Sequence, residues 1–240
     1  MSAARRLIVS ADDFGMSPGV NAGIIRAHRE GILTDASLMV NGSAFAEAVD
    51  LARAHPTLSV GLHLVLLQGR AVSPPADIPR LAGRDGCFGT QPIWGGMRFF
   101  FSPGARAQVR QEVTAQLDKF LATGLPLSHV DGHVTIHMHP VVMGVLVDVS
   151  ARYGMRAVRL PRESLAAALR YDRRHLARKC FEAMVFELLS RWALPRLERA
   201  GIRHPDRLFG LHQTGQQIGG HTRQDRADAK AGEALFASHR

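Results

Sequence analysis

Short apolar segments alternate with helical patterns along the first 211 residues, and this alternation restricts the fold more than any other feature. The apolar segments are short and are bounded by turn-forming residues, as strands are. Strands are predicted at 6–11, 36–40, 58–64, 127–131, 157–160 and 207–211. Regular succession of strand and helix is typical of parallel α/β proteins, so we expect an open doubly wound sheet or a reduced barrel.

The helices predicted between these strands have recognisable ends. The first covers 18–30, with Ser17 as its N-terminal cap, Pro18 in the first turn and Gly31 at its end. Further helices are expected at 45–54, 105–123, 141–153 and across most of 164–200. The turn after the first strand, ADDFGMSPG, lacks the G-x-G-x-x-G pattern, which argues against a dinucleotide-binding fold.

Residues 66–103 form a long segment that is rich in proline and glycine and contains two aromatic clusters, CFG and IWGGMRFFF. Long irregular segments in compact domains are usually functional loops. We predict that this loop folds over the strand ends and lines a substrate entrance with Trp94, Phe99, Phe100 and Phe101. The alternative is that the four aromatic side chains close a small satellite core.

The chain of 240 residues is long enough for one large domain. We place a single catalytic domain at 1–212, because the remainder, 213–240, is polar and glycine-rich and is predicted to be a poorly ordered tail. No apolar run approaches the roughly 20 residues of a membrane span. The apolar stretch near the N-terminus is too short for a signal peptide, so a cytoplasmic location is expected.

A formal net charge of +9 makes the chain basic. Such a charge suits an anionic membrane surface or another anionic partner, and it also suits a merely solvated basic face. No nucleic-acid-binding motif accompanies the charge, so no nucleic-acid partner is expected. Association at the periphery of the inner membrane and formation of a homodimer are both left open at this stage.

Polar side chains stand at the ends of three predicted strands. Asp12 and Asp13 follow the first strand, and both can reach one site only where the strand ends and the backbone turns. His63 lies within the apolar run VGLHL, and four histidines and an aspartate fall within HVDGHVTIHMHP, residues 129–140. Each group also has a plainer interpretation: a helix-capping Asp beside a solvated one, a hydrogen-bonded core histidine, or surface histidines.

The carboxyl ends of parallel strands meet on one side of an α/β fold and form its functional site. Carboxylate and imidazole groups that converge there are the ligands of a divalent metal ion such as Zn²⁺, Mg²⁺ or Mn²⁺. Such an ion activates a water molecule, and a second carboxylate beside it can act as a general base. These residue types therefore favour a metal-dependent hydrolase.

Four segments in this order and spacing, VSADDFGMSPGVNAGI, LMVNG, VGLHL and HVDGH with HMHP, resemble the YdjC-like (ChbG-like) carbohydrate deacetylases. The likeness runs from about Arg6 to Leu211 and is strongest to the hopanoid-biosynthesis-associated HpnK branch, with VRLPRE as a further match. It implies a distorted (β/α) barrel of the glycoside hydrolase/deacetylase type with parallel strands. It also implies metal-dependent removal of the acetyl group from an N-acetylated sugar, for this branch the N-acetylglucosamine of a hopanoid glycolipid.

The resemblance assigns the metal site residue by residue. Asp13, His63 and His133 match the family's metal ligands, and they imply one divalent metal ion, Mg²⁺ or Zn²⁺, as the cofactor. Asp12 matches the family's catalytic base. The two neighbouring carboxylates would then divide the work, one binding the metal ion and the other accepting a proton.

Three further residues are candidates for handling the substrate. Arg159, in VRLPRE, falls where relatives often carry a polar active-site residue, and we expect it to bind substrate. Trp94, in the aromatic loop, is a second candidate for substrate binding. The amine that leaves an amide needs a proton. Asp12 could return the one it accepted, or a nearby imidazole could supply it, and His137 is our candidate for that imidazole.

Two departures from the family pattern leave alternatives open. Val134 and Thr135 stand where many relatives have further histidines, and the late His-Pro element of relatives has no counterpart after Leu211, since His204-Pro205 comes too early. A catalytically impaired remnant that binds a sugar or lipid is therefore one alternative. A metal-dependent phosphoesterase is another, although no phosphate-binding glycine loop stands in the right place.

Overall fold

The computed structural model describes residues 5–166, 169, 174–211 and 233–239. Within these residues, six strands form one curled sheet in the order β4-β3-β2-β1-β6-β5. The strands are β1 (Arg5–Phe14), β2 (Asp35–Leu38), β3 (Ser59–Leu64), β4 (Val130–Gly132), β5 (Arg207–Phe209) and β6 (Glu233–His239). Neighbouring strands from β1 to β4 run parallel, as the alternating pattern predicts, whereas β6 runs antiparallel to both of its neighbours.

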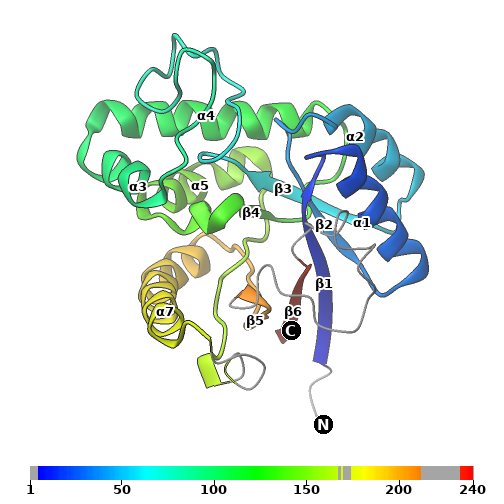
Figure 1. Ribbon diagram of the computed structural model, residues 1–240. Coiled ribbons are helices and arrows are strands. Elements are labelled where there is room, and N and C mark those ends of the chain that lie inside the picture. The colour runs from blue at the N-terminus through cyan, green and yellow to red at the C-terminus, as the bar shows by residue number, and fades with distance from the viewer. Residues whose placement is uncertain (1–4, 167–168, 170–173, 212–232, 240) are drawn as a thin grey trace.

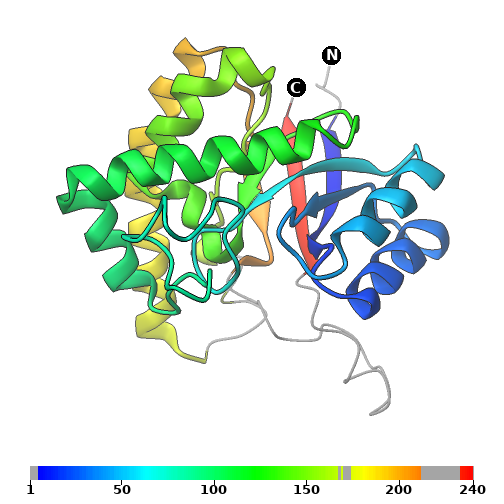
Figure 2. The same ribbon diagram turned by 90° about the horizontal axis from the view of Figure 1, so that it is seen from above.

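Helices cover the outside of the curled sheet (Figure 1 and Figure 2). They are α1 (Pro18–Glu30), α2 (Phe45–Ala54), α3 (Pro92–Phe101), α4 (Pro103–Leu121), α5 (Pro140–Tyr153) and α7 (Leu176–Arg199), with a 3-10 segment, η1 (His133–Met138), directly after β4. In both views α1 and α2 lie on the opposite side of the molecule from α7. Helices thus follow the strands around the sheet, as in a (β/α) barrel.

A short extended segment, residues 157–163, joins the two edges of the sheet. At one edge Val158 forms a parallel bridge with Val130 of β4, and at the other Glu163 forms a parallel bridge with Leu208 of β5. These bridges close the sheet into a distorted barrel, which confirms the expected fold class. The fifth predicted strand is present only as such isolated bridges and not as a continuous ladder.

The C-terminal part differs from the prediction. Residues 213–240 are predicted to form a tail without a strand, and this is wrong for Glu233–His239, which pair with β1 along its length and with β5. An open strand edge presents unpaired N–H and C=O groups, and a backbone partner satisfies them whatever its side chains are. Residues 212–232 lie outside the described residues, so the domain boundary at 212 stays a prediction.

The long segment 66–103 is not irregular throughout. Its last part, Pro92–Phe101, forms α3. Phe99 is buried against the core, whereas Phe100 and Phe101 are exposed. The aromatic cluster is therefore divided, because the faces of one helix point in different directions.

Two buried polar side chains of α4 hold the beginning of this segment. Glu112 accepts the N–H of Val72 at 2.8 Å and the N–H of Ser73 at 2.9 Å. One turn further on, Gln116 accepts the N–H of Val65 at 3.0 Å and donates to the carbonyl oxygen of the same residue at 2.6 Å. The helix thus satisfies backbone groups that no strand reaches.

Replacing Glu112 by alanine is expected to destabilise the protein by about 2 to 4 kcal/mol, because two backbone N–H groups lose a charged acceptor. Urea unfolding followed by circular dichroism measures the change. Gln111→Ala, at an exposed position of the same helix, is the matched control and should change the free energy of unfolding by less than about 0.5 kcal/mol. Equal stabilities of the two variants would contradict this role of Glu112.

Candidate metal centre

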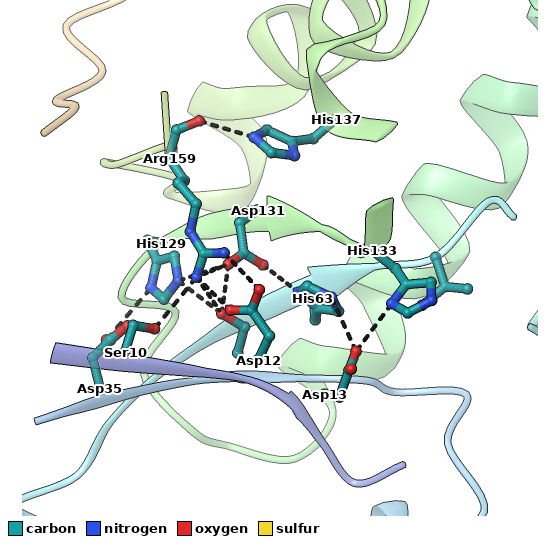
Figure 3. A network of polar contacts seen from close by, with 12 residues as sticks. Ser10, Asp12, Asp13, Asp35, His63, His129, Asp131, His133, His137 and Arg159 are labelled. Atoms are coloured by element: carbon teal, nitrogen blue, oxygen red, sulfur yellow. Dashed lines mark hydrogen bonds and ion pairs between the residues drawn. The ribbon is translucent and has the colours of Figure 1, made fainter. Parts of the chain in front are cut away.

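A left-handed residue at the end of β1 brings two neighbouring carboxylates to one place. Asp13 has φ 64°, and the pairing of β1 with β2 shifts its register between Ala11 and Phe14. In a regular strand, the side chains of Asp12 and Asp13 would point to opposite faces. The shift and the turn remove this alternation, so both carboxylates point toward the same group of side chains (Figure 3). Gly15, with φ 91°, continues the turn.

His63 on β3 lies between two carboxylates and is 1% exposed. Its Nδ1 atom is 2.7 Å from Asp131 Oδ1, and its Nε2 atom is 3.3 Å from Asp13 Oδ1. Donation from Nδ1–H to Asp131 leaves Nε2 facing Asp13. A carboxylate behind an imidazole fixes the orientation of the ring and raises its basicity, as is usual for histidines that bind metal ions.

His133 reaches the same carboxylate from the segment after β4. Its Nδ1 atom is 3.0 Å from Asp13 Oδ1, and the ring centroids of His133 and His63 are 5.7 Å apart. The backbone that follows is strained, because Val134 and Thr135 have φ 47° and φ 60°. Residues branched at Cβ rarely adopt this left-handed conformation, so the surrounding fold imposes it. The strained pair lies inside η1, directly after His133.

Asp13, His63 and His133 fit a divalent metal ion. Their ligand atoms all lie within 4.8 Å of one another. The two nitrogen-to-oxygen distances to Asp13 are close to the ~3.4 Å between neighbouring ligands of a tetrahedral zinc site. Two histidines and one carboxylate also leave a coordination position open, as in catalytic sites. The structure thus brings together the three predicted ligands, and their role as ligands stays a prediction.

The electrostatics of this group also suit a cation. Burial alone would lower the pKa of His63, but the Asp131 carboxylate and a hydrogen bond to Asp13 outweigh it and raise the pKa to about 10. Burial would raise the pKa of Asp13, and hydrogen bonds from His133 and His63 reverse the effect and lower it. The carboxylates thus favour positive charge at His63, and a divalent cation bound by Nε2 would supply that charge in place of the proton.

The second carboxylate, that of Asp12, is held by Arg159. Nη1 of Arg159 donates to Asp12 Oδ2 at 2.8 Å and Nη2 donates to Oδ1 at 2.6 Å, which makes a bidentate pair. Nη2 also contacts Asp131, and the Arg159 side chain is only 9% exposed. The sequence predicts Arg159 to bind substrate, but its guanidinium group lies where it orients Asp12, so this geometry does not support direct contact with a substrate.

His137 does not join the group. Its ring is buried, its Nε2 atom is 2.9 Å from the carbonyl oxygen of Arg159, and burial lowers its pKa to about 4. A neutral and enclosed histidine is poorly suited to give a proton to a departing amine. The side chain of Trp94 lies outside the described residues, so its contact with substrate stays a prediction.

Asp131 is absent from the residues assigned on sequence alone, yet it lies at the centre of the site. It is fully buried, accepts a hydrogen bond from Ser37 Oγ at 2.6 Å and binds His63. The motif HVDGH contains a signal for it. Because alternate residues of a strand share a face, His129, Asp131 and His133 are expected on one side of β4.

A curled α/β sheet with carboxylate and histidine groups at the carboxyl ends of its strands is typical of barrel enzymes that bind a metal ion. Comparison with known families agrees with this class, since residues 6–239 match the family model of YdjC-like proteins. The chain therefore belongs to the YdjC-like family, as its four motifs predict. The particular likeness to the hopanoid-associated branch stays a prediction.

Several relatives of known name are carbohydrate deacetylases. The chain is 45% identical to that of Brevibacillus brevis over 148 residues, which are 62% of this chain and 56% of the relative. It is 41% identical to that of Geobacillus stearothermophilus over 160 residues, 66% of this chain and 62% of the relative. With that of Mus musculus it shares 35% identity over 241 residues, 97% of this chain and 76% of the relative. The chain thus spans less than two thirds of the two bacterial relatives.

Among solved structures, the chain is similar to a crystal structure of a candidate cellobiose-phosphate cleavage protein from Enterococcus faecalis V583. The TM-score is 0.56 and the sequence identity 31%, over 63% of this chain and 57% of that chain. The likeness supports the α/β fold over the aligned part. A shared fold does not by itself imply a shared substrate.

Replacing Val134 by glycine is expected to stabilise the protein by about 1 kcal/mol. Glycine adopts this left-handed conformation without the strain of roughly 1–3 kcal/mol, and its greater freedom in the unfolded chain offsets about 0.5–1 kcal/mol. Val134 is 45% exposed, so little packing is lost. Chemical denaturation measures the change, with Val134→Ala as the control that keeps Cβ and should gain less. A glycine variant less stable than the wild type would argue against strain at this position.

Proposed function

We propose that this chain is a metal-dependent deacetylase that hydrolyses the N-acetyl group of a sugar. The observation that carries the proposal is the convergence of Asp13, His63 and His133 at strand ends, with the carboxylate of Asp12 beside them (Figure 3). Membership of the YdjC-like family and similarity to carbohydrate deacetylases support the same reaction. The substrate class is accordingly an N-acetylated sugar, free or as part of a glycolipid.

Asp13, His63 and His133 would hold one divalent ion. When bound, such an ion polarises the amide carbonyl and lowers the pKa of water. Of the two ions that the resemblance implies, Zn²⁺ suits two imidazoles and one carboxylate better than Mg²⁺, which prefers oxygen ligands. We therefore propose Zn²⁺ as the resident ion.

Asp12 acts as the general base in this proposal. It accepts a proton from the attacking water as the water oxygen adds to the carbonyl carbon of the acetyl group. It then returns this proton to the amide nitrogen as the C–N bond breaks, which releases acetate and leaves a free amine on the sugar. Arg159 binds both oxygens of Asp12 and thereby fixes the carboxylate in place. This route does not require the enclosed His137.

Exposed apolar side chains on two helices favour a substrate that is presented at a membrane surface. On α7, Phe181, Met184 and Leu188 recur at spacings of three and four residues and are 62%, 54% and 60% exposed. On α3, Phe100 and Phe101 are also exposed. Contiguous exposed apolar surface commonly marks a site of interaction.

The two helices that carry these side chains, α3 and α7, lie on the same side of the molecule in Figure 1 and Figure 2. The net charge of +9 would add attraction to an anionic bilayer. We propose that this side contacts the membrane and that the substrate is a glycolipid of the kind implied for the hopanoid-associated branch. No helix among the described residues combines the length and apolarity needed to cross a membrane.

Acetate release tests the proposed reaction. The purified protein is treated with a chelator, reloaded with Zn²⁺ or Mg²⁺, and given chito-oligosaccharides or a glycolipid that carries N-acetylglucosamine. Acetate release that needs the ion supports the proposal. Absence of release from every N-acetylated sugar and glycolipid by the reloaded protein would favour the binding remnant, and phosphate release from phosphate esters would favour a phosphoesterase.

Substitutions at the two carboxylates should separate their roles. Asp12→Asn is expected to lower turnover by about 10²–10⁴-fold, because a positioned base is lost, while metal content stays near that of the wild type. Asp13→Asn is expected to lose the metal ion. Metal analysis and acetate release on both variants provide the measurement. If Asp12→Asn empties the site while Asp13→Asn keeps it filled, the two roles are the reverse of those proposed.

Loss of the apolar side chains of α7 should weaken membrane binding. The double variant Phe181→Ser, Leu188→Ser is expected to sediment less with vesicles that contain anionic phospholipid, because burial of apolar side chains stabilises the bound state. Ile32→Ser, at a position that is 71% exposed before β2, is the matched control and should bind as the wild type does. Unchanged sedimentation of the double variant would exclude α7 from the contact.

A further inference from the structure

His129 has no part in the reaction proposed above, yet its side chain lies inside the barrel and is only 14% exposed. It directly precedes β4 and pairs with β3 through its carbonyl oxygen, which accepts the N–H of Leu62 at 2.9 Å. In Figure 3 the ring lies beside Asp35 and Arg159, on the side of Asp131 away from His133.

The ring of His129 lies between two buried carboxylates. Its Nε2 atom is 3.2 Å from Ser37 Oγ and 3.6 Å from Asp131 Oδ2. Its Nδ1 atom is 2.8 Å from Ser128 Oγ and 3.6 Å from Asp35 Oδ1. Both edges of the ring therefore face polar groups, and a positive charge on it offsets the carboxylate on either side.

The hydroxyl group of Ser37 connects His129 to Asp131. Ser37 Oγ donates its single proton to Asp131 Oδ2 at 2.6 Å, so its oxygen can only accept from Nε2–H of His129. His129 thus keeps this hydroxyl turned toward Asp131. Burial alone would lower the pKa of His129, but the charge of Asp35 and a hydrogen bond to Asp131 outweigh it and raise the pKa, which favours a proton on both ring nitrogens.

A glycine on strand β3, Gly61, leaves room for this ring. A Cβ atom on Gly61 would lie 2.3 Å from Nδ1 of His129 and 2.6 Å from its carbonyl oxygen. Glycine is therefore required for the ring and the strand to approach this closely. Since residues two apart on a strand share a face, Gly61 and His63 point the same way, and the ring of His129 packs beside the strand that carries the ligand.

We propose that His129 is a positioning residue of the metal centre, which acts through Asp131 on the ligand His63 and through Asp131 and Arg159 on the base Asp12. The inference rests on the metal centre of the proposed function. Groups that orient a ligand from behind commonly change metal affinity by 10–100-fold when they are removed. His129 acts one contact further from the metal ion than Asp131 does. Its hydrogen bond with Ser37, which in turn donates to Asp131, transmits the effect.

Two substitutions of His129 test this role, because their side-chain amides extend to different distances from the backbone. The side-chain amide of His129→Gln can occupy the place of Nε2 and keep a donor toward Ser37 and Asp131. The amide of His129→Asn reaches only the place of Nδ1. Zn²⁺ alone is titrated into the metal-free full-length protein by calorimetry with a competing chelator. His129→Asn is expected to weaken Zn²⁺ binding about 10–100-fold, and His129→Gln should stay close to the wild type.

The control is His28→Asn, which should leave Zn²⁺ affinity unchanged. His28 bonds Leu33 and Thr57, which precede β2 and β3, whereas the centre lies where the strands end. If His129→Asn binds Zn²⁺ as the wild type does, or if both His129 variants lose affinity equally, the positioning role is overturned. A wild type that binds no Zn²⁺ would instead overturn the metal centre, and the proposed function with it.

Thermal unfolding shows whether each variant is folded before its affinity is interpreted. If neither His129 variant folds, Ser37→Ala takes their place, because it removes the hydroxyl between His129 and Asp131 and leaves the ring intact. The same 10–100-fold loss of Zn²⁺ affinity is then expected. Unchanged affinity of Ser37→Ala would overturn the inference.

Discussion

One buried carboxylate, that of Asp131, holds the functional end of the barrel together. It is fully buried and contacts side chains from β2, from β3 and from the segment that closes the sheet, namely Ser37, His63 and Arg159. A buried charge that loses its partner costs several kcal/mol. The barrel interior can therefore be stable only when these groups are in place, so the site is ordered by folding itself.

The strands reconcile this charged interior with a hydrophobic core by alternation. On β3, Gly61 and His63 face the interior contacts described above, whereas Leu62 and Leu64 belong to the buried hydrophobic cluster. On β2, Ser37 faces the interior, and its neighbours are buried alanine and leucine. The apolar face packs under the helices and supplies the stabilisation that the polar face lacks. Strand β3, SVGLHL, therefore looks largely apolar in sequence although it carries His63.

The parts that sequence predicts well are those with a local cause. Ser17 caps α1 through its side chain, as its position before Pro18 indicates, and Asp13, His63 and His133 converge because parallel strands end on one side. Asp131 is marked in the sequence only by the two-residue alternation within HVDGH, and its contacts with Ser37 and Arg159 appear only in the folded chain. Likewise β6 pairs with the backbone edge of β1, which is far from it in the sequence.

Arg159 lies on the segment that closes the barrel, residues 157–163. Closure of the sheet therefore also brings Arg159 to Asp12 and orients this carboxylate. This segment is joined to β4 and β5 by isolated bridges, whereas β1 and β3, which carry Asp13 and His63, each pair with β2 at several residues. Regions with fewer backbone contacts open at lower free energy than the ladders around them. Opening of this segment would withdraw Arg159 from both Asp12 and Asp131. The fold thus makes positioning of the proposed base depend on its least extensively paired segment.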